Sequence, residues 1–324
     1  MRALLIVNPH ATSTTQPRRD LIVRALASAV DLEVVQTRYR GEATGLAAGA
    51  AEQGMDLIIT LGGDGTVNEA VNGLRAAADE RNVGAADLPA LASLPGGNAN
   101  VFVRSLGLPP DPVDAAARLI EDLATGRERE IGLGTANGRY FTFNAGLGLD
   151  AEVVRAAEGR RAHGRALTPA RYLRTALRQF FRITDRQHPA VTIAAPEDLC
   201  ADPVFVCIVS NSAPWTYLGD RPVQTNPDAS FDTGLDLFAL RTLSTAGTLL
   251  TLRQMLSERD RPPRGRGVLT SHDLDKIALQ ADRPVAFQVD GEYIGETEMV
   301  EFRSVPRALR VLGVAAQPTR AIST

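Results

Sequence analysis

From Leu4 to Leu106, short apolar runs alternate with longer segments of helical periodicity. The apolar runs are typical of buried strands and predict four of them, at Leu4–Val7, Leu32–Thr37, Asp56–Leu61 and Ala90–Leu94. The segments between them predict helices at Arg18–Ala29, Thr44–Glu52 and Asn68–Glu80, with one more that ends near Leu106. Strands that alternate with helices favour a doubly wound parallel sheet in an α/β domain.

The pattern changes after about Glu130, where strands follow one another. Asn137-Gly138 is a strong hairpin signal between Gly132–Thr135 and Arg139–Asn144. Further strands are expected at Val191–Ala194, Val204–Ser210, Leu235–Leu240, Ile277–Ala281, Val285–Val289, Val300–Arg303 and Ala308–Leu312, with helices around Pro169–Arg182 and at Ser244–Ser257. We therefore expect an α/β domain over residues 1–130 and a mostly β, sandwich-like domain over residues 131–315, whose last strand can return to the first domain. Residues 316–324 are expected to form a frayed tail.

Composition narrows the function classes. The 324 residues are 44% hydrophobic, which suits a globular protein of two domains, and the net charge of -3 gives no basic field for nucleic acid. No apolar run approaches the length of a membrane span, and the N-terminal run is too short for a signal peptide, so we expect a cytoplasmic protein. Two cysteines and four histidines show no zinc-ligand spacing. Lys276 is the sole lysine among 35 basic residues, so the Gly-Lys-Ser/Thr of a P-loop is absent.

Three loops each follow a predicted parallel strand, at Asn8–Thr12, Gly62–Thr66 and Pro95–Asn100. Loops in this position gather at the carboxyl edge of the sheet, where glycine-rich backbone and a helix N-terminus bind phosphate. Asp64 places a carboxylate inside this anion site, which indicates a bridging cation, most simply Mg²⁺. A single glycine-rich loop would favour a plain tight turn, but three loops together at one edge of the sheet favour a binding site.

The segment from Gly62 to Leu74, Gly-Gly-Asp-Gly-Thr-Val-Asn-Glu-Ala-Val-Asn-Gly-Leu, resembles the signature of the diacylglycerol kinase catalytic-domain family, which includes bacterial lipid kinases and sphingosine kinases. Its Gly62–Thr66 core is shared with NAD kinases and phosphofructokinases, whereas Asn68-Glu69 and Asn72–Leu74 favour the lipid branch. Other matching pieces occur in family order at Asn8-Pro9, Thr37, Pro95–Asn100, Asn144–Asp150 and Val289–Glu292. The stretch Ser210–Gly219 looks like the actinobacterial form of these enzymes.

This resemblance implies an ATP-dependent lipid kinase, with diacylglycerol as the first substrate to consider and phosphatidic acid as the product. Another lipid (a sphingoid base or a phosphatidylglycerol type), NAD, or a non-catalytic lipid- or nucleotide-binding role remain alternatives. The resemblance assigns the general base to Glu292, with Asp290 beside it. The Mg²⁺ expected at Asp64 is then the ion carried by ATP. The nucleotide-binding positions that it implies are Asn8, Pro9, Thr12, Thr37, Gly62, Gly63, Asp64, Gly65, Thr66, Asn68, Glu69, Gly97 and Asn98. Without the resemblance, Asp290-Gly291-Glu292 would read as an exposed turn.

The chain departs from the family pattern at several positions. Asn98 stands where threonine is usual, and Val101 stands where aspartate is frequent. Some bacterial members hold a structural Mg²⁺ through an aspartate before the glycine of the Phe231–Leu235 segment, but Thr233 occupies that position here. A structural ion near Ser230–Leu235 is therefore expected to be weak or absent, while the Mg²⁺ carried by ATP is retained.

A lipid kinase must reach a bilayer, and we expect peripheral contact with anionic phospholipid at the inner face of the cell membrane. Four arginines, Arg171, Arg174, Arg178 and Arg182, share one face of a predicted helix whose apolar face is expected to pack on the second domain. Arg155, Arg160, Arg161 and Arg165 form a second basic stretch, and Arg259, Arg261, Arg264 and Arg266 a third. Three roles are open for Trp215: it lines the entry of the acyl chain, anchors at the membrane interface, or packs in the core. A homodimer is possible, and no nucleic-acid partner is expected.

Overall fold

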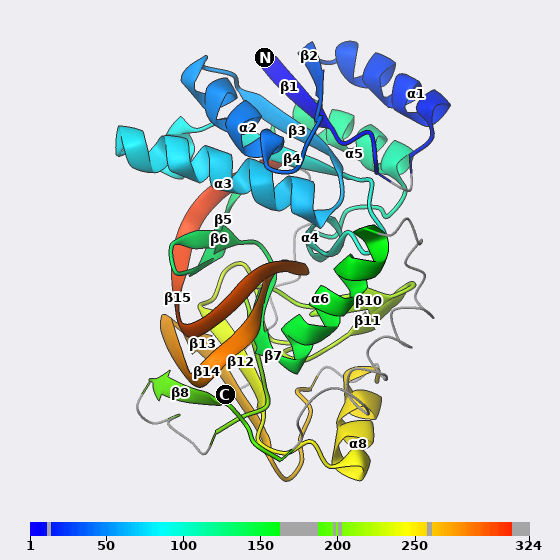
Figure 1. Ribbon diagram of the computed structural model, residues 1–324. Helices are drawn as coiled ribbons and strands as arrows, with labels where there is room; N and C mark the ends of the chain where they lie inside the picture. The colour runs from blue at the N-terminus through cyan, green and yellow to red at the C-terminus, as the bar shows by residue number, and fades with distance from the viewer. Residues whose placement is uncertain (12–13, 163–186, 197–198, 200–202, 258–260, 313–324) are drawn as a thin grey trace, which may run out of the picture. The chain divides into compact units, whose positions relative to one another are not determined.

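A computed structural model of the chain divides into two compact units. It describes residues 1–312 apart from residues 12–13, 163–186, 197–198, 200–202 and 258–260. The first unit comprises residues 1–130 together with the segment that begins at Leu309, and the second comprises residues 131–308. Figure 1 shows the helices and strands of both units.

A parallel sheet forms the centre of the first unit. Its strand order is β2-β1-β3-β4-β15, and the strands are β1 (Arg2–Val7), β2 (Asp31–Gln36), β3 (Leu57–Gly62), β4 (Ala90–Pro95) and the end of β15 (Glu292–Leu312). Leu5 pairs with Val34 on one side and with Ile59 on the other, and Val311 pairs with Leu91. The strands β3 and β4 are buried along their whole length, as expected for a sheet covered on both faces. The predicted doubly wound α/β domain is therefore confirmed.

Helices cover both faces of this sheet (Figure 1). On one face α1 (Gln16–Ala27) and α5 (Pro112–Thr125) pack over the alternate strand residues that include Leu5, Ile59 and Ala92. On the other face lie α2 (Glu42–Glu52) and α3 (Asp64–Arg81). These two helices approach closely at Gly73, which has no side chain. A Cβ atom added there would lie 2.1 Å from the carbonyl oxygen of Thr44. The short helices η1 (Ala85–Asp87) and α4 (Val101–Ser105) complete the unit.

The second unit is mostly β, as the sequence predicts. Its sheet has the order β13-β12-β9-β7-β14-β15, and each neighbouring pair in this order is antiparallel. The strands are β7 (Asn144–Gly148), β9 (Val206–Ser210), β12 (Leu235–Leu240), β13 (Val268–Leu274) and β14 (Lys276–Val289), with β8 (Val191–Ala195) on β14. The predicted hairpin joins β5 (Glu128–Ala136) to β6 (Arg139–Phe141), while β10 (Thr216–Leu218) and β11 (Arg221–Val223) pair separately. Asn137 and Gly138 both adopt positive φ, as a tight hairpin turn requires.

Apolar clusters lie on both faces of the second sheet. Cys207 and Val209 face the larger cluster, whereas Val206 and Ile208 on the same strand face a smaller one. Trp215 packs against the smaller cluster together with residues of α8 (Thr245–Met255). The helix α6 (Leu149–Ala162) contacts β7, β9 and β14. The helix predicted at Pro169–Arg182 lies outside the described residues, and the one predicted at Ser244–Ser257 is α8.

Candidate functional site

Three loops, two of them rich in glycine, lie at the carboxyl ends of β1, β3 and β4. Strand order reverses between β1 and β3, because β2 lies beyond β1 and β4 lies beyond β3. Such a reversal places the loops that follow the two strands on opposite faces of the sheet and leaves a crevice between them, where doubly wound folds bind ligands. The loops therefore lie where doubly wound folds bind ligands, at the strand-order reversal of the first unit.

Asn8 ties the first loop to the second. Its amide nitrogen donates to Thr66 Oγ1 at 3.3 Å, and its Oδ1 accepts from the backbone N–H of His10 at 2.9 Å. The backbone N–H of Asn8 also donates to the carbonyl oxygen of Leu61 at 3.0 Å. Asn8 thereby fixes the loop after β1 against the start of α3, and Thr66 is buried beside it.

The glycines of the second and third loops touch one another through backbone atoms. Gly96 N–H donates to the Gly62 carbonyl at 2.7 Å. A Cβ atom at Gly96 would lie 2.9 Å from Gly62 Cα, and one at Gly97 would lie 2.8 Å from Gly63 Cα. Side chains at Gly96 or Gly97 would therefore push the loops apart, so glycine is required here for close packing of the loops themselves.

Asp64 begins α3 directly after this contact. Its Oδ1 accepts from the backbone N–H of Phe102 at 3.1 Å, near the start of α4. Asp64 is therefore a link between the second and third loops as well as the carboxylate expected to approach a cation. The 18-residue helix that it begins directs its first N–H groups toward the same end of the sheet.

Two other positions of the signature make structural contacts. Glu69 accepts from the backbone N–H of Gly41 at 2.8 Å and of Ala43 at 3.2 Å, and so caps the start of α2. Asn68 is buried and accepts from the side chain of Asn72 at 3.2 Å. These contacts connect residues within α3 and join α3 to α2. Asn68 and Glu69, which the sequence analysis placed among the nucleotide-binding positions, therefore also contribute to helix packing.

The remaining nucleotide positions are distributed along the same loops. Thr37 follows β2, and its backbone N–H donates to the Val7 carbonyl at 2.9 Å. Pro9 and Asn98 are exposed, Gly65 is half-buried, and Thr12 lies outside the described residues. Asn100, not among the expected site residues, exchanges two hydrogen bonds of 2.8 Å with the backbone of Gly97 and thereby closes the third loop.

In the second unit, Asp290 and Gly291 form the tight turn between β14 and β15. Both have positive φ, and Val289 pairs with Glu292 across the turn. Asp290 is 3% exposed, and its carboxylate accepts four hydrogen bonds from residues 142–144. The segment is thus a turn, but not the exposed one that the residues alone suggested, because the buried Asp290 carboxylate anchors it to residues 142–144. Glu292 is half-buried at the start of β15.

A buried polar network lies behind this turn. The side-chain nitrogen of Gln288 donates to Asp150 Oδ2 at 2.8 Å and to Asn144 Oδ1 at 2.9 Å, while its oxygen accepts from Gly291 N–H at 2.9 Å. Burial raises the pKa of Asp150 to about 6, and the Gln288 hydrogen bond opposes this rise. Sequence analysis assigned no role to Gln288 or Asp150. The signal that could have found them is a glutamine two residues before Asp290 in an otherwise apolar strand.

Glycine at position 146 makes room for this network. A Cβ atom there would lie 2.4 Å from Asp150 Oδ2 and 3.1 Å from Gln288 Nε2. The helix α6, which carries Asp150, is also joined to the strand that follows Glu292. Arg155 lies 2.8 Å from Glu296 Oε1 and 5.3 Å from the ring centroid of Tyr293. Arg155 is therefore engaged on both sides within the second unit.

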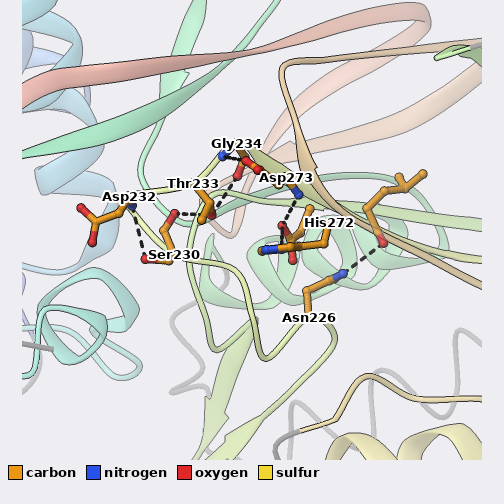
Figure 2. A network of polar contacts seen from close by, with 9 residues as sticks. Asn226, Ser230, Asp232, Thr233, Gly234, His272 and Asp273 are labelled. Carbon is orange, nitrogen blue, oxygen red and sulfur yellow. Dashed lines mark hydrogen bonds and ion pairs between the residues drawn. The ribbon is translucent and has the colours of Figure 1, made fainter. Parts of the chain in front are cut away.

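The segment expected to bind a structural ion is closed by hydrogen bonds (Figure 2). Thr233 Oγ1 donates to the Ser230 carbonyl at 3.1 Å, and Gly234 N–H donates to Asp273 Oδ1 at 2.6 Å. Burial raises the pKa of Asp236 to about 6, although His272 at 2.8 Å opposes the rise. Within the described part of the chain, no group of three or more His, Cys, Asp or Glu could hold a metal ion. The side chains at this turn therefore do not fit a carboxylate cage.

No helix among the described residues is long and apolar enough to cross a membrane. Of the expected basic surfaces, Arg165, Arg171, Arg174, Arg178 and Arg182 lie outside the described residues, as does Arg259. Arg261, Arg264 and Arg266 are described and exposed.

Comparison with known proteins gives matches along the whole chain. Residues 2–136 match the diacylglycerol kinase catalytic domain. A diacylglycerol kinase of Bacillus subtilis is 43% identical over 36% of this chain and 35% of its own, and one of Staphylococcus saprophyticus is 34% identical over 43% of each. The chain thus spans less than half the length of these two relatives. A probable YegS-like lipid kinase of Chromohalobacter salexigens is 26% identical over 89% of this chain and 86% of its own.

Solved structures show the same fold. The structure of a putative diacylglycerol kinase from Bacillus anthracis has a TM-score of 0.76 with 24% identity, and it covers 97% of each chain. Another diacylglycerol kinase structure from that organism has a TM-score of 0.72 with 22% identity over 97% of each chain.

Proposed function

We propose that the chain, whose residues 2–136 match the diacylglycerol kinase catalytic domain, transfers the γ-phosphate of ATP to the hydroxyl of a lipid, most simply diacylglycerol. The observation that carries the proposal is the meeting of the loop after β1 with the two glycine-rich loops after β3 and β4, at the strand-order reversal of a parallel sheet and beside the start of α3. Relatives over this region are named diacylglycerol kinases, which favours diacylglycerol among possible lipids.

The first unit supplies the groups for ATP. Gly62 and Gly63 precede α3, and their close contacts with Gly96 and Gly97 bring the second and third loops together where the helix N-terminus is electropositive. Asn8 and Thr66 are already hydrogen-bonded to each other, so this part of the site is fixed before the nucleotide binds. Neutral backbone amides thus serve where P-loop proteins use lysine.

Mg²⁺, when bound with ATP, would neutralise phosphate charge and orient the triphosphate. Asp64 is the carboxylate among these loops that would lie nearest to it. Since Asp64 Oδ1 accepts from Phe102 N–H at 3.1 Å, its orientation is set by the protein. A single protein carboxylate suits an ion that is held mainly by phosphate oxygens and water.

Glu292 would act as the general base. As the lipid hydroxyl oxygen forms its bond to the γ-phosphorus, the bond to the bridging oxygen of ADP breaks, and the hydroxyl proton passes to the Glu292 carboxylate. Asp290 is not assigned this task, because four hydrogen bonds already engage its buried carboxylate. Asp290 and Gln288 instead position the turn, since Asp290 ties it to residues 142–144 and Gln288 accepts from Gly291 N–H, next to Glu292.

The test is phosphate transfer from γ-labelled ATP to a panel of diacylglycerol, a sphingoid base and phosphatidylglycerol, with NAD as the soluble alternative. We expect labelled phosphatidic acid. Glu292→Gln should lower turnover by about a thousandfold while ATP affinity, measured by fluorescent nucleotide binding, is unchanged.

Glu298→Gln, an exposed glutamate on the same strand, is the matched control and should retain activity. If NAD rather than a lipid becomes labelled, the protein is a kinase of a soluble substrate and the proposal is wrong. Near wild-type turnover of Glu292→Gln would show that the base is another group.

A further inference from the structure

The helix α8 has apolar residues on its outer face as well as on its inner face. Inward, Thr251 and Met255 are buried, and Leu252 packs against the smaller apolar cluster of the second unit. Outward, Ala246, Leu249, Leu250 and Arg253 are exposed at helical spacing. A surface helix ordinarily carries charged or polar side chains on its outer face.

The two outward leucines are unusual for this chain. Leu249 and Leu250 are each 53% exposed, and they are the only sequence neighbours among the large hydrophobic residues exposed in the described ranges. The helix has no acidic residue and no lysine, and Arg253 is its one charged side chain. The outer face is therefore apolar along its middle and positively charged toward its C-terminal end.

A basic loop is fastened beside this face. Gln254 of α8 donates to the Arg264 carbonyl at 2.8 Å and accepts from Arg264 N–H at 3.0 Å, so the loop follows the helix end. The loop also carries Arg261 and Arg266, both exposed. Together with Arg264 and with Arg253 of α8, these make four exposed arginines among the described residues of this region, although the whole chain has a net charge of -3. Positive charge is thus concentrated at this surface.

We propose that the outer face of α8 and the arginines of residues 261–266, together the α8 surface, dock on an anionic lipid bilayer. Apolar side chains that enter the interface and arginines that meet lipid phosphates are the two contributions that hold peripheral proteins on membranes. Charge complementarity selects this occupant. A second copy of the chain would bring the same arginines against each other, which opposes a symmetric dimer through this surface.

The experiment is flotation of the full chain with vesicles of phosphatidylcholine alone or with about 30% phosphatidylglycerol, without nucleotide, so that the outcome does not depend on kinase activity. The wild type should bind the anionic vesicles and not the neutral ones. The Leu249→Gln/Leu250→Gln double variant should bind about tenfold less, and replacing Arg261, Arg264 and Arg266 by Gln should weaken binding further at low salt.

Leu21→Gln is the matched control, because Leu21 is a leucine 47% exposed on α1 of the first unit, and it should bind as the wild type. Fluorescence of Trp215, which packs in the cluster beneath α8, reports that the variants are folded. Equal binding of the wild type and the leucine double variant would overturn the proposal, as would failure of the wild type to float with anionic vesicles. A wild-type dimer that the leucine variant dissociates would assign the surface to a second copy instead.

Discussion

Asp150 should make the free energy of unfolding of the second unit depend on pH. It is 6% exposed, and burial raises its pKa to about 6 from an ordinary value of 3.8. The folded protein therefore holds this proton more tightly than the unfolded chain does. The contribution of the protonated Asp150 to the free energy of unfolding is fully present below about pH 4 and is lost as the pH rises through about 6.

The size of the effect follows from the two pKa values. A rise of about two pKa units corresponds to about 3 kcal/mol lost at high pH, and about half of this lies between about pH 5 and about pH 8. Asp150→Asn keeps the shape and an oxygen that accepts from Gln288, but it removes the ionisation. The free energy of unfolding of the variant, relative to wild type, should therefore increase by about 1.4 kcal/mol between these two pH values.

The assay is urea unfolding at both pH values, followed by fluorescence of Trp215. This residue is the sole tryptophan and lies in the same unit as Asp150, so the signal reports the second unit. Comparing the variant with wild type at each pH cancels any constant effect of the new amide group. Asp282→Asn, whose side chain is 64% exposed in the same unit, is the control and should show no such change.

A difference in unfolding free energy that is independent of pH would refute the reasoning, because it would mean that Asp150 titrates alike in the folded and unfolded chain. A difference that decreases as the pH rises would mean that its charge is stabilised by the network around it.

Further predictions concern packing and the two turns. Gly73→Ala should lower the free energy of unfolding of the first unit by about 2 kcal/mol, because the new Cβ would lie 2.1 Å from the Thr44 carbonyl. Gly45→Ala, in the neighbouring helix with open space around it, should raise it by about 0.5 kcal/mol, and circular dichroism measures both. Asp290→Asn should destabilise the second unit by about 2 kcal/mol in urea unfolding, because an amide cannot accept all four of its hydrogen bonds. Chelation by EDTA should leave the Tm unchanged, because hydrogen bonds already close the 230–234 turn; a fall restored by Mg²⁺ would contradict this.

Local signals sufficed for much of the fold. The apolar runs placed β1, β3 and β4 because parallel strands buried on both faces must be continuously apolar. They divided β14 and β15 into shorter strands, because polar residues interrupt the apolar pattern where one face of each strand is exposed.

Two helices were missed. The helix α5 begins at Asp111-Pro112, where the aspartate side chain accepts from Val113 N–H at 2.9 Å. That pair is a recognisable N-cap signal. The helix α6 follows β7 without a break, and its first turn carries the buried Asp150, so its start lacks the usual polar-to-apolar contrast.

Side-chain roles were harder to predict than loop positions. A motif records which residues occur together, but not which atoms they contact. Glu69 belongs to the signature, yet its carboxylate caps α2, a contact that depends on how the two helices pack. Gln288 escaped notice for the converse reason: it belongs to no motif, and its importance arises from the turn that its oxygen holds.

The path of β15 has a consequence for biosynthesis. The first sheet is completed by Leu309–Leu312, where Val311 pairs with Leu91 and Leu312 joins the apolar cluster under α1 and α5. A ribosome makes these residues only after the whole second unit. Until then β4 is the outermost strand of a nascent sheet, with unpaired backbone groups along one side. The first unit is therefore translated first, but its sheet can be completed only after the second unit has been made.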